Sequence, residues 1–410
     1  MPAAHKKNEQ KSAAAATPAV QWLTPLCVRL YCGALFLIEC YLFLYWFWAY
    51  HVARDPAVSI LGWDFAVYWS ASSLAMTHGA PAAYDWGLLK AAEASLLPAG
   101  SFGPFAYPPS FLLLIYPIAM LPVGMAFLTF LICGVVLYLA VTRWTSGPVR
   151  AWWLLPALGF PGLWVAMAAG QNSLFTLAVA GSTLMLLRRH PIAAGAGIAL
   201  LCMKPQLGAL FPLLLLCEKR WAAIASAAAS SLLYITATWL AFGTETFMAS
   251  ARSITLFRHE FAENSIQVLS GAPTVFAVAR TAGCSVQVSY LVHAIVAVAA
   301  VALCAWLWIT RSRFGLSASA FIAASLLFQP YLLYYDLAWL ALPISWLSVD
   351  FARRGYTTSD IALLIITWLA PLQSFLAVPY PAMGQWTPAV LLLMLAAIWH
   401  RHRLELSSRM

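Results

Sequence analysis

Apolar segments recur along the whole length of this chain, and they constrain its fold more than any other feature. Hydrophobic residues make up 63% of the sequence and charged residues only 9%. The first segment, from about Leu26 to Tyr50, is long enough to cross a hydrocarbon core of about 30 Å as a helix. Strands would need the alternating pattern of a closed barrel, which the sequence lacks, because open sheet edges cannot be satisfied in lipid. We therefore predict an all-α polytopic membrane protein.

The apolar segments predict a bundle of about 12 or 13 transmembrane helices. The segment at 108–120 begins with two prolines and contains Pro117, so we expect it to be re-entrant or interfacial instead of crossing once. Residues 1–20 are expected to form a disordered cytoplasmic tail, and residues 21–410 a single transmembrane domain. The other spans are expected at about 122–142, 151–168, 173–187, 190–203, 205–218, 221–242, 287–310, 315–329, 332–350, 360–377 and 386–400.

Arginine and lysine residues in the short loops indicate the orientation, because such residues are enriched on the cytoplasmic side. The remaining loops then face outward, and the two long ones cover 51–107 and 243–286. We expect interfacial helices at about 65–78 and 86–97 in the first, and another near 273–281 in the second. The residues placed inside are Arg143, Arg150, Arg188, Arg189, Lys219, Arg220, Arg311, Arg313, Arg353, Arg354, Arg401 and Arg403.

Composition excludes several other functions. The net charge of +9 follows from the basic loops, with no basic stripe, so nucleic-acid binding is not expected, whereas contact with anionic lipid is compatible with it. The eight cysteines form no CxxC or Cys/His cluster, and most lie in or beside apolar segments. Neither a metal site, a disulfide framework nor a cofactor is therefore indicated.

Asp64 is the first candidate for chemistry. It follows the first span directly, between Trp63 and Trp69, whose rings favour the headgroup level of a membrane. A carboxylate at that depth is energetically unfavourable, so it is expected to have either a functional role or a charged or polar partner. Asp64 is either a general base that deprotonates an acceptor hydroxyl or the N-cap of the helix beginning at Phe65, and one residue can do both.

Lys204 and Asp336 are the next two candidates. Lys204 would be the lone cation on its outer loop, so a phosphate is a natural partner, while a snorkelling side chain is the alternative. Asp336 stands inside an apolar segment, so it either has a partner, such as Lys204 or an arginine of the second outer loop, or lines a water-filled cavity. In that loop, Arg252 and Arg258 are further candidates for binding the donor phosphate, because an arginine pair suits an anionic lipid head, although they also fit a solvated face of mixed charge.

Other polar residues lie at the predicted outer ends of the spans. Gln171 and Asn172 either bind sugar hydroxyls or form a hairpin turn before the next helix. Tyr84 and Asp85 form a turn or contact substrate, and Tyr107 either shapes an acceptor rim or stiffens the entry into the membrane. The full set of candidate substrate-binding residues is Trp63, Tyr68, Tyr84, Asp85, Tyr107, Gln171, Asn172, Gln206, Tyr331, Tyr335 and Asp336.

These residues belong to an ordered series of short motifs. The series is Asp64-Phe65-x-x-Tyr68-Trp69, Gly79-x-Pro81-x-x-Tyr84-Asp85, Phe105-x-Tyr107-Pro108-Pro109, Gly170-Gln171-Asn172, Lys204-Pro205-Gln206 and Pro330 to Tyr335-Asp336. Over about residues 20–400, it resembles glycosyltransferase family 87, which holds polyprenol-phosphate-mannose-dependent α-mannosyltransferases and related bacterial enzymes of the GT-C fold. The resemblance implies a polyprenyl-phosphate sugar donor, a lipid-linked or glycan acceptor, and metal-independent inverting transfer with Asp64 as the base.

We therefore expect an integral-membrane glycosyltransferase that moves a mannose-like hexose or a pentose. By resemblance, its place is the bacterial inner membrane, with the active site on the extracytoplasmic face. A transporter or flippase of lipid-linked glycans is the alternative of another class. Transporters usually show internal repeats and interrupted helices in matching halves, and no convincing repeat is visible here. An O-antigen-ligase-like or other GT-C enzyme is an alternative within the same class.

Overall fold

The computed structural model describes residues 24–53, 55, 58, 60–98, 100–147 and 153–407, and the part that it describes contains no strand. The predicted tail at 1–20 lies outside the described residues. Within the described part, six helices are long and apolar enough to cross a membrane. They are Leu26–Tyr50, Val123–Thr145, Trp221–Ala262, Val286–Ile309, Thr358–Leu376 and Pro381–Ser407. The prediction of an all-α polytopic membrane protein is confirmed.

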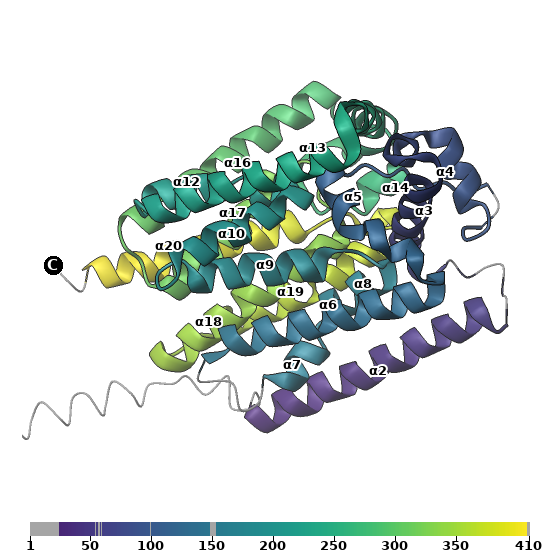
Figure 1. Cartoon of the computed structure of the whole chain (residues 1–410). Helices are drawn as coiled ribbons and strands as arrows, with labels where there is room; N and C mark the ends of the chain where they lie inside the picture. Colours follow the sequence, from purple (N-terminus) through teal and green to yellow (C-terminus); the bar gives the residue numbers. More distant parts are fainter. Residues whose placement is uncertain are drawn as a thin grey trace, which may run out of the picture.

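Shorter apolar helices fill the interior between the long ones (Figure 1). In chain order the helices are α2 (Pro25–His51), α3 (Trp63–His78), η2 (Ala80–Tyr84), α4 (Trp86–Glu93), α5 (Pro109–Ile115), η3 (Tyr116–Met120), α6 (Val123–Thr145), α7 (Leu154–Leu158), α8 (Pro161–Ala169), α9 (Ser173–Leu186), α10 (Pro191–Leu200), η5 (Leu201–Met203), α11 (Pro205–Gly208), α12 (Phe211–Cys217), α13 (Trp221–Phe257), η6 (Arg258–Ala262), α14 (Ile266–Ser270), α15 (Val275–Thr281), α16 (Val286–Ile309), α17 (Phe314–Phe328), η7 (Tyr334–Leu340), α18 (Ala341–Arg354), α19 (Thr358–Leu376), η8 (Pro381–Met383) and α20 (Thr387–Ser407).

Helix α17 forms the centre of the bundle. Every residue from Leu316 to Leu327 is buried, which suits a helix that is apolar on all sides. It packs against α16, α18 and α20. Because its neighbours bury it completely, α17 can be shorter than a helix that crosses the bilayer alone.

Basic residues of the loop before α17 and of the end of α20 lie together at one end of the bundle, and Arg150 lies outside the described residues. Arg313 contacts Asp350 at 2.8 Å and also pairs with Glu405, and Arg401 pairs with Asp350 and Asp360. These contacts join the start of α17 to α18, α19 and α20. Figure 1 shows α3, α4 and α14 at the end opposite the C-terminus, which lies beyond α20. The structure therefore separates the basic end from the end that carries the polar motifs.

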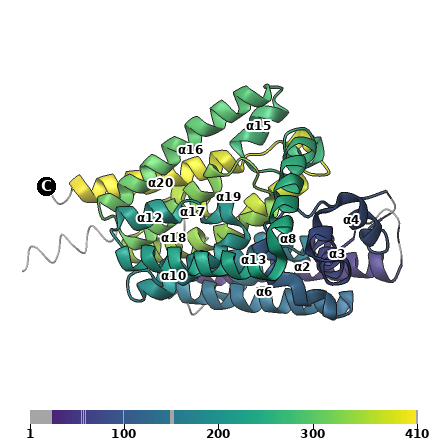
Figure 2. The ribbon, with the colours of Figure 1, turned by 45° about the horizontal axis from the view of Figure 1, so that its top comes forward.

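The second long loop is more helical than expected. Helix α13 continues past the predicted end at 242 to Phe257, with a break at Gly243, where φ is +72°. The π-helical turn η6 and the short helices α14 and α15 follow it. Helix α15 (Val275–Thr281) confirms the helix expected near 273–281. Figure 2 shows the first part of α13 running beside α10, against which it packs.

The segment at 108–120 does not form one long helix. It folds as α5 and η3, which change type at Tyr116-Pro117. Helices of this length reach well short of the roughly 30 Å of a hydrocarbon core. The expectation that this segment is no simple crossing therefore agrees with its fold.

Helix α3 forms where expected, but it is buried and does not present one amphipathic face. Its buried residues include Phe65, Tyr68, Ala71 and Leu74, which lie on several sides of the helix. They pack with residues of η2, α5 and α6 in a separate apolar cluster. The idea that Asp64 caps α3 is wrong, because the cap position belongs to Gly62 and Asp64 lies in the first turn.

Two glycines let the start of α3 approach the turn between α8 and α9. The Gly62 N–H donates to the Ala168 carbonyl at 2.8 Å, and Gly170 has a φ of +70°. A Cβ at Gly170 would lie 2.7 Å from the Cβ of Phe65 and 3.0 Å from the Cα of Gly62. This close backbone contact places Asp64 beside Gln171.

Replacing Gly170 by alanine should destabilise the protein. The left-handed backbone alone costs about 1–2 kcal/mol for a residue with a Cβ, and the overlap with Phe65 adds to that. Thermal unfolding of the purified protein in detergent measures the effect. Gly124→Ala is the matched control, because a Cβ there meets nothing within 4 Å. Equal unfolding temperatures for the two variants would contradict the tight contact.

Candidate active site

Four interruptions of the helical bundle bring polar side chains to one place. Asp64 lies in the first turn of α3, and Gln171 lies in the turn between α8 and α9. Lys204 separates η5 from α11, and Asp336 lies in the 3₁₀ helix η7. Non-helical backbone at membrane depth is tolerated where it is buried in protein or lines a cavity. These interruptions therefore mark the natural position of a site.

Lys204 and Asp336 form a buried ion pair. The Lys204 Nζ donates to Asp336 Oδ1 at 2.6 Å, and the two side chains are only 5% and 3% exposed. The Ser173 hydroxyl donates to the same oxygen at 2.7 Å. Lys204 also lies 5.2 Å from the ring centroid of Tyr335. Lys204 is thus the partner of Asp336. It is one of the partners that the sequence suggested for this carboxylate.

Gln171 is the centre of a second hydrogen-bond network. Its Oε1 accepts from the Tyr68 hydroxyl at 2.6 Å, the Tyr107 hydroxyl at 3.1 Å and the Asn172 N–H at 3.1 Å. The two tyrosine hydroxyls are 2.8 Å apart. Gln171 also shares a side-chain hydrogen bond with Asp64, in which the Nε2 amide group donates because an ionised carboxylate only accepts.

Asp64 is the carboxylate without a cation. The described residues include no ion pair to it, in contrast to Asp336, and its residue is partly exposed while Asp336 is buried. Burial of the carboxyl group raises the pKa of Asp64 to about 7, against the lowering effects of the Gln171 hydrogen bond and the Lys204 charge. A carboxylate with this pKa changes charge near neutral pH, as a general base should.

Trp63 and Tyr335 are the other candidates near this cluster. The Nε1 of Trp63 would lie 3.0 Å from a Cβ at Gly103, so its ring packs against the loop that leads to Tyr107. Tyr335 is 7% exposed and precedes Asp336 directly. Its ring lies 5.2 Å from the Lys204 Nζ, and its hydroxyl interacts electrostatically with Asp64 and Asp336.

Four of the candidate substrate-binding residues lie outside this cluster and have structural contacts. Tyr84 packs on Phe105, with ring centroids 5.4 Å apart. The Asp85 carboxylate caps α4 by accepting from the Gly87 and Leu88 N–H groups. The exposed Gln206 offers its carbonyl to Gln329, and the Tyr331 hydroxyl donates to Glu263 at 3.2 Å.

Arg252 and Arg258 also lie apart from the cluster. Both are exposed, Arg252 on α13 and Arg258 at the start of η6. Arg258 lies 3.6 Å from Glu263. Among the described residues, neither arginine pairs with Asp64 or Asp336, so the charge that faces the polar cluster comes from Lys204.

Two residues of the site are not among the candidates that the sequence suggested. Ser173 binds Asp336, and its position as the first residue of α9, directly after Gln171-Asn172, was the available signal. Gln329 is buried, and its amide reaches the Gln206 carbonyl. It thereby joins the interruption at Lys204 to the one before η7. Among the described residues, no group of three or more His, Cys, Asp or Glu could hold a metal ion.

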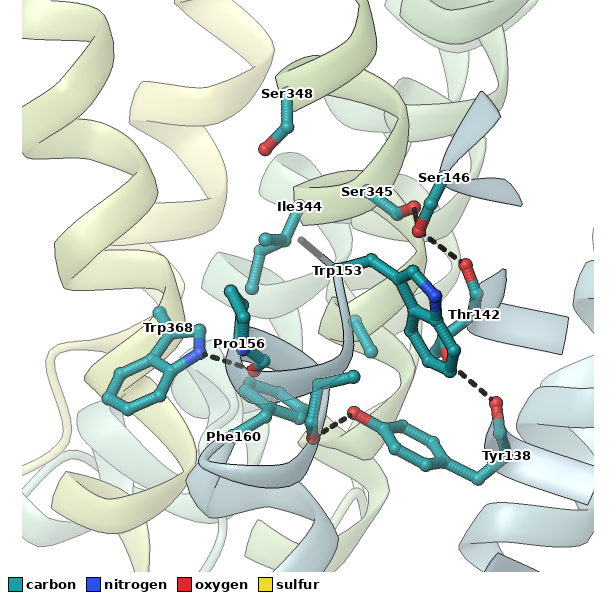
Figure 3. Close-up of a pocket in the computed structure, with 12 residues that line it drawn as sticks. Tyr138, Thr142, Ser146, Trp153, Pro156, Phe160, Ile344, Ser345, Ser348 and Trp368 are labelled. Carbon is teal, nitrogen blue, oxygen red and sulfur yellow. Dashed lines mark hydrogen bonds between the residues drawn. The ribbon is translucent and has the colours of Figure 1, made fainter. Parts of the chain in front are cut away.

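A small cavity lies at the C-terminal end of α6 (Figure 3). It measures about 70 Å³ and lies between α6, α7, α18 and α19. Hydroxyls such as those of Thr142, Ser146 and Ser345 line it, and the Ser146 hydroxyl donates to the Thr142 carbonyl. No acidic or basic side chain lines this cavity, so it offers no base for catalysis.

The fold and the site together define a polytopic helical membrane protein with a polar cluster at the end opposite its basic loops. The chain belongs to glycosyltransferase family 87, whose model matches residues 105–330, more than half of its length. It is therefore a membrane glycosyltransferase. No curated protein and no solved structure matches it. The matched stretch contains Tyr107, Gln171 and Lys204, while Asp64 and Asp336 flank it.

Loss of both members of the Lys204–Asp336 pair should cost less than the sum of the two single losses. Removing one partner of a buried pair leaves an uncompensated charge and costs about 3–5 kcal/mol. We expect Lys204→Met and Asp336→Leu each to lower the thermal stability strongly, and the double variant to lose less than their sum.

Arg188→Met serves as the surface control for this cycle. Arg188 lies 3.7 Å from Glu218, and its side chain is 50% exposed, so its loss should cost only about 0–1 kcal/mol. Unfolding temperatures in detergent provide the comparison. Strictly additive effects of Lys204→Met and Asp336→Leu would show that the two side chains are not coupled.

Proposed function

We propose that this glycosyltransferase transfers a mannose-like hexose or a pentose from a polyprenyl-phosphate donor to a lipid-linked or glycan acceptor, with inversion and with Asp64 as the general base. The reaction takes place on the extracytoplasmic face of the bacterial inner membrane. The proposed site combines residues from segments as far apart in the sequence as Asp64 and Asp336. This supports the proposal that these segments belong to a single transmembrane domain.

The observation that carries this proposal is the different state of the two carboxylates. Asp336 is neutralised by Lys204 and bonded to Ser173, so it is poorly suited to accept a proton. Asp64 has no cation of its own among the described residues, and its pKa of about 7 lets it accept a proton near neutral pH. The site therefore offers one available base beside one fixed ion pair.

The proposed step balances with one base. The acceptor hydroxyl loses its proton to Asp64, its oxygen forms a bond to the anomeric carbon, and the bond from that carbon to the phosphate oxygen breaks. The electron pair leaves with the polyprenyl phosphate. Because phosphate is a good leaving group, no second carboxylic acid is needed to protonate it, unlike in hydrolysis by paired carboxylates.

Lys204 is the proposed ligand of the donor phosphate. Its ammonium group has three donors, and the contact with Asp336 uses one of them. The others are available to phosphate oxygens, and the charge stabilises the phosphate as it leaves. Asp336 and Ser173 then act as positioning residues that hold the cation in place.

The remaining candidates have supporting roles in this proposal. Tyr68, Tyr107 and Gln171 keep the Asp64 carboxylate oriented through the network around Gln171. The exposed Arg252 and Arg258 attract anionic lipid heads toward the site, a longer-range effect than direct phosphate binding. Trp63, Tyr84, Asp85, Asn172, Gln206, Tyr331 and Tyr335 stay proposed substrate contacts.

An assay with the reconstituted protein tests the proposed reaction. A panel of polyprenyl-phosphate sugars is supplied, and products are identified by mass spectrometry. We expect Asp64→Asn to abolish transfer, since the amide cannot accept the proton. With wild-type protein, kcat/KM should fall as the pH drops below about 7 and level off above it, because the base must be ionised.

Glu245→Gln is the matched control, because Glu245 is an exposed carboxylate of α13 outside the polar cluster. It should keep the same pH profile. Thermal unfolding checks that Asp64→Asn is folded. Full transfer by Asp64→Asn, or a profile without a step near neutral pH, would remove the base assignment.

The proposed face of the reaction is tested by labelling intact cells with a membrane-impermeant thiol reagent. In a variant without native cysteines, Ser95→Cys lies just after α4 and Ser359→Cys in the first turn of α19, and both positions are exposed. We expect labelling of position 95 before lysis and of position 359 only afterwards. The opposite pattern would place the polar cluster on the cytoplasmic side.

A further inference from the structure

A long apolar groove adjoins the polar cluster. Its volume is about 900 Å³, within the range of pockets that bind drug-sized ligands. Helix α9 forms the floor through Phe175, Val179, Thr183 and Leu186, which lie along one face. Helices α6 and α10, which both pack against α9, form the two walls. In Figure 1, α9 lies between these two helices.

The groove follows most of the height of the bundle. Its lining on α9 runs from Asn172 to Leu186, a distance of about 20 Å along a helix. Leu114, Leu137 and Leu200 line it and are also 44%, 42% and 44% exposed. The groove is thus open on the outside of the bundle, where hydrocarbon surrounds a membrane protein. Helices α5 and η3 lie over the end beside the polar cluster.

Two residues of the groove adjoin the polar cluster directly. Asn172 follows Gln171, and Met203 precedes Lys204, and both line the groove. Asn172 is 1% exposed, and neither polar atom of its side chain has a hydrogen-bond partner. A buried amide without partners is unfavourable by itself. It indicates that a group with donors or acceptors belongs at the junction of groove and cluster.

We propose that this groove binds the isoprenoid chain of the sugar donor, with Asn172 at the point where the chain meets its phosphate. This inference rests on the proposed function. The lining has no charged residue, as an isoprenoid requires. Met203, which lines the groove, directly precedes Lys204 in the chain, so the hydrocarbon chain of a donor whose phosphate Lys204 holds can extend into the groove. The Asn172 amide then donates to the phosphate and loses its unfavourable isolation.

The donor's chain fits this position better than a lipid chain of the acceptor. The reactive hydroxyl of an acceptor must reach Asp64, which is held by Gln171. The groove ends at Met203, next to Lys204, the proposed ligand of the donor phosphate, and at Asn172, next to Gln171, so the donor is assigned through its phosphate and the acceptor chain is the competing occupant in the experiment below. An ordinary bilayer lipid would also fill the apolar part of the groove, so the comparison of long-chain and short-chain donors below distinguishes the two occupants.

Filling the groove tests this assignment. Ala193 on α10 and Ala140 on α6 line opposite walls, and both are exposed. Ala196 is an exposed residue of α10 outside the lining. We compare Ala193→Phe and Ala140→Phe with Ala196→Phe as the control. Each receives the same sugar phosphate on a long polyprenyl chain or on a short, water-soluble terpenyl chain.

We expect both groove variants to lose about tenfold or more in kcat/KM with the long-chain donor and to keep wild-type values with the short-chain donor. Ala196→Phe should match wild type with both donors. Equal losses with both donors, or a changed KM for the acceptor alone, would overturn the assignment. They would instead indicate a bilayer lipid or the acceptor chain in the groove.

A binding experiment separates this inference from the proposed reaction. Polyprenyl phosphate without sugar, carrying a photoreactive group on its chain, is cross-linked to the purified protein, and the labelled peptides are identified. Labelling of α9 and α10 that Ala193→Phe abolishes and Ala196→Phe keeps supports the groove even if no sugar is transferred. Labelling elsewhere overturns it, even where the transferase reaction is confirmed.

Discussion

The site depends on one buried ion pair. Lys204 and Asp336 come from interruptions far apart in the sequence, and both are almost completely buried. Neither charge would be tolerated alone at this depth, so the helices that carry them must come together in one way. Ser173 extends the constraint to the start of α9. The pair fixes the position of a cation that can face an anionic substrate.

Asp64 is held by a different means. The contact between Gly62 and Gly170 brings the two backbones together, and Gln171 then bonds to Asp64 and accepts from two tyrosines. A polar amide, and not a cation, holds this carboxylate, so its charge is not neutralised. The molecule therefore keeps one carboxylate paired and another available for proton transfer, although both lie in one polar cluster.

Much of this arrangement could be predicted, and the limits have physical reasons. The length of the apolar segments predicted an all-α polytopic membrane protein. The positions of the basic loops indicated that the polar interruptions share one end of the bundle. The burial of α3 was not predictable, because nearly every face of that helix can pack in a protein core. Arg252 and Arg258 were grouped with the donor site by charge, but charge says nothing about distance. The groove could not be predicted from the sequence, because the apolar residues that line it cannot be distinguished from residues that face lipid.

The same structural logic explains why groove and cluster adjoin. An apolar bundle stays stable only if its interruptions pair with one another, so polar groups gather where several helices end. Just below that point the surrounding helices are apolar again, and α6, α9 and α10 leave the groove between them. A substrate with a charged head on a hydrocarbon chain has the same division between polar and apolar parts. The proposed donor matches this division at Asn172, where the polar cluster meets the groove.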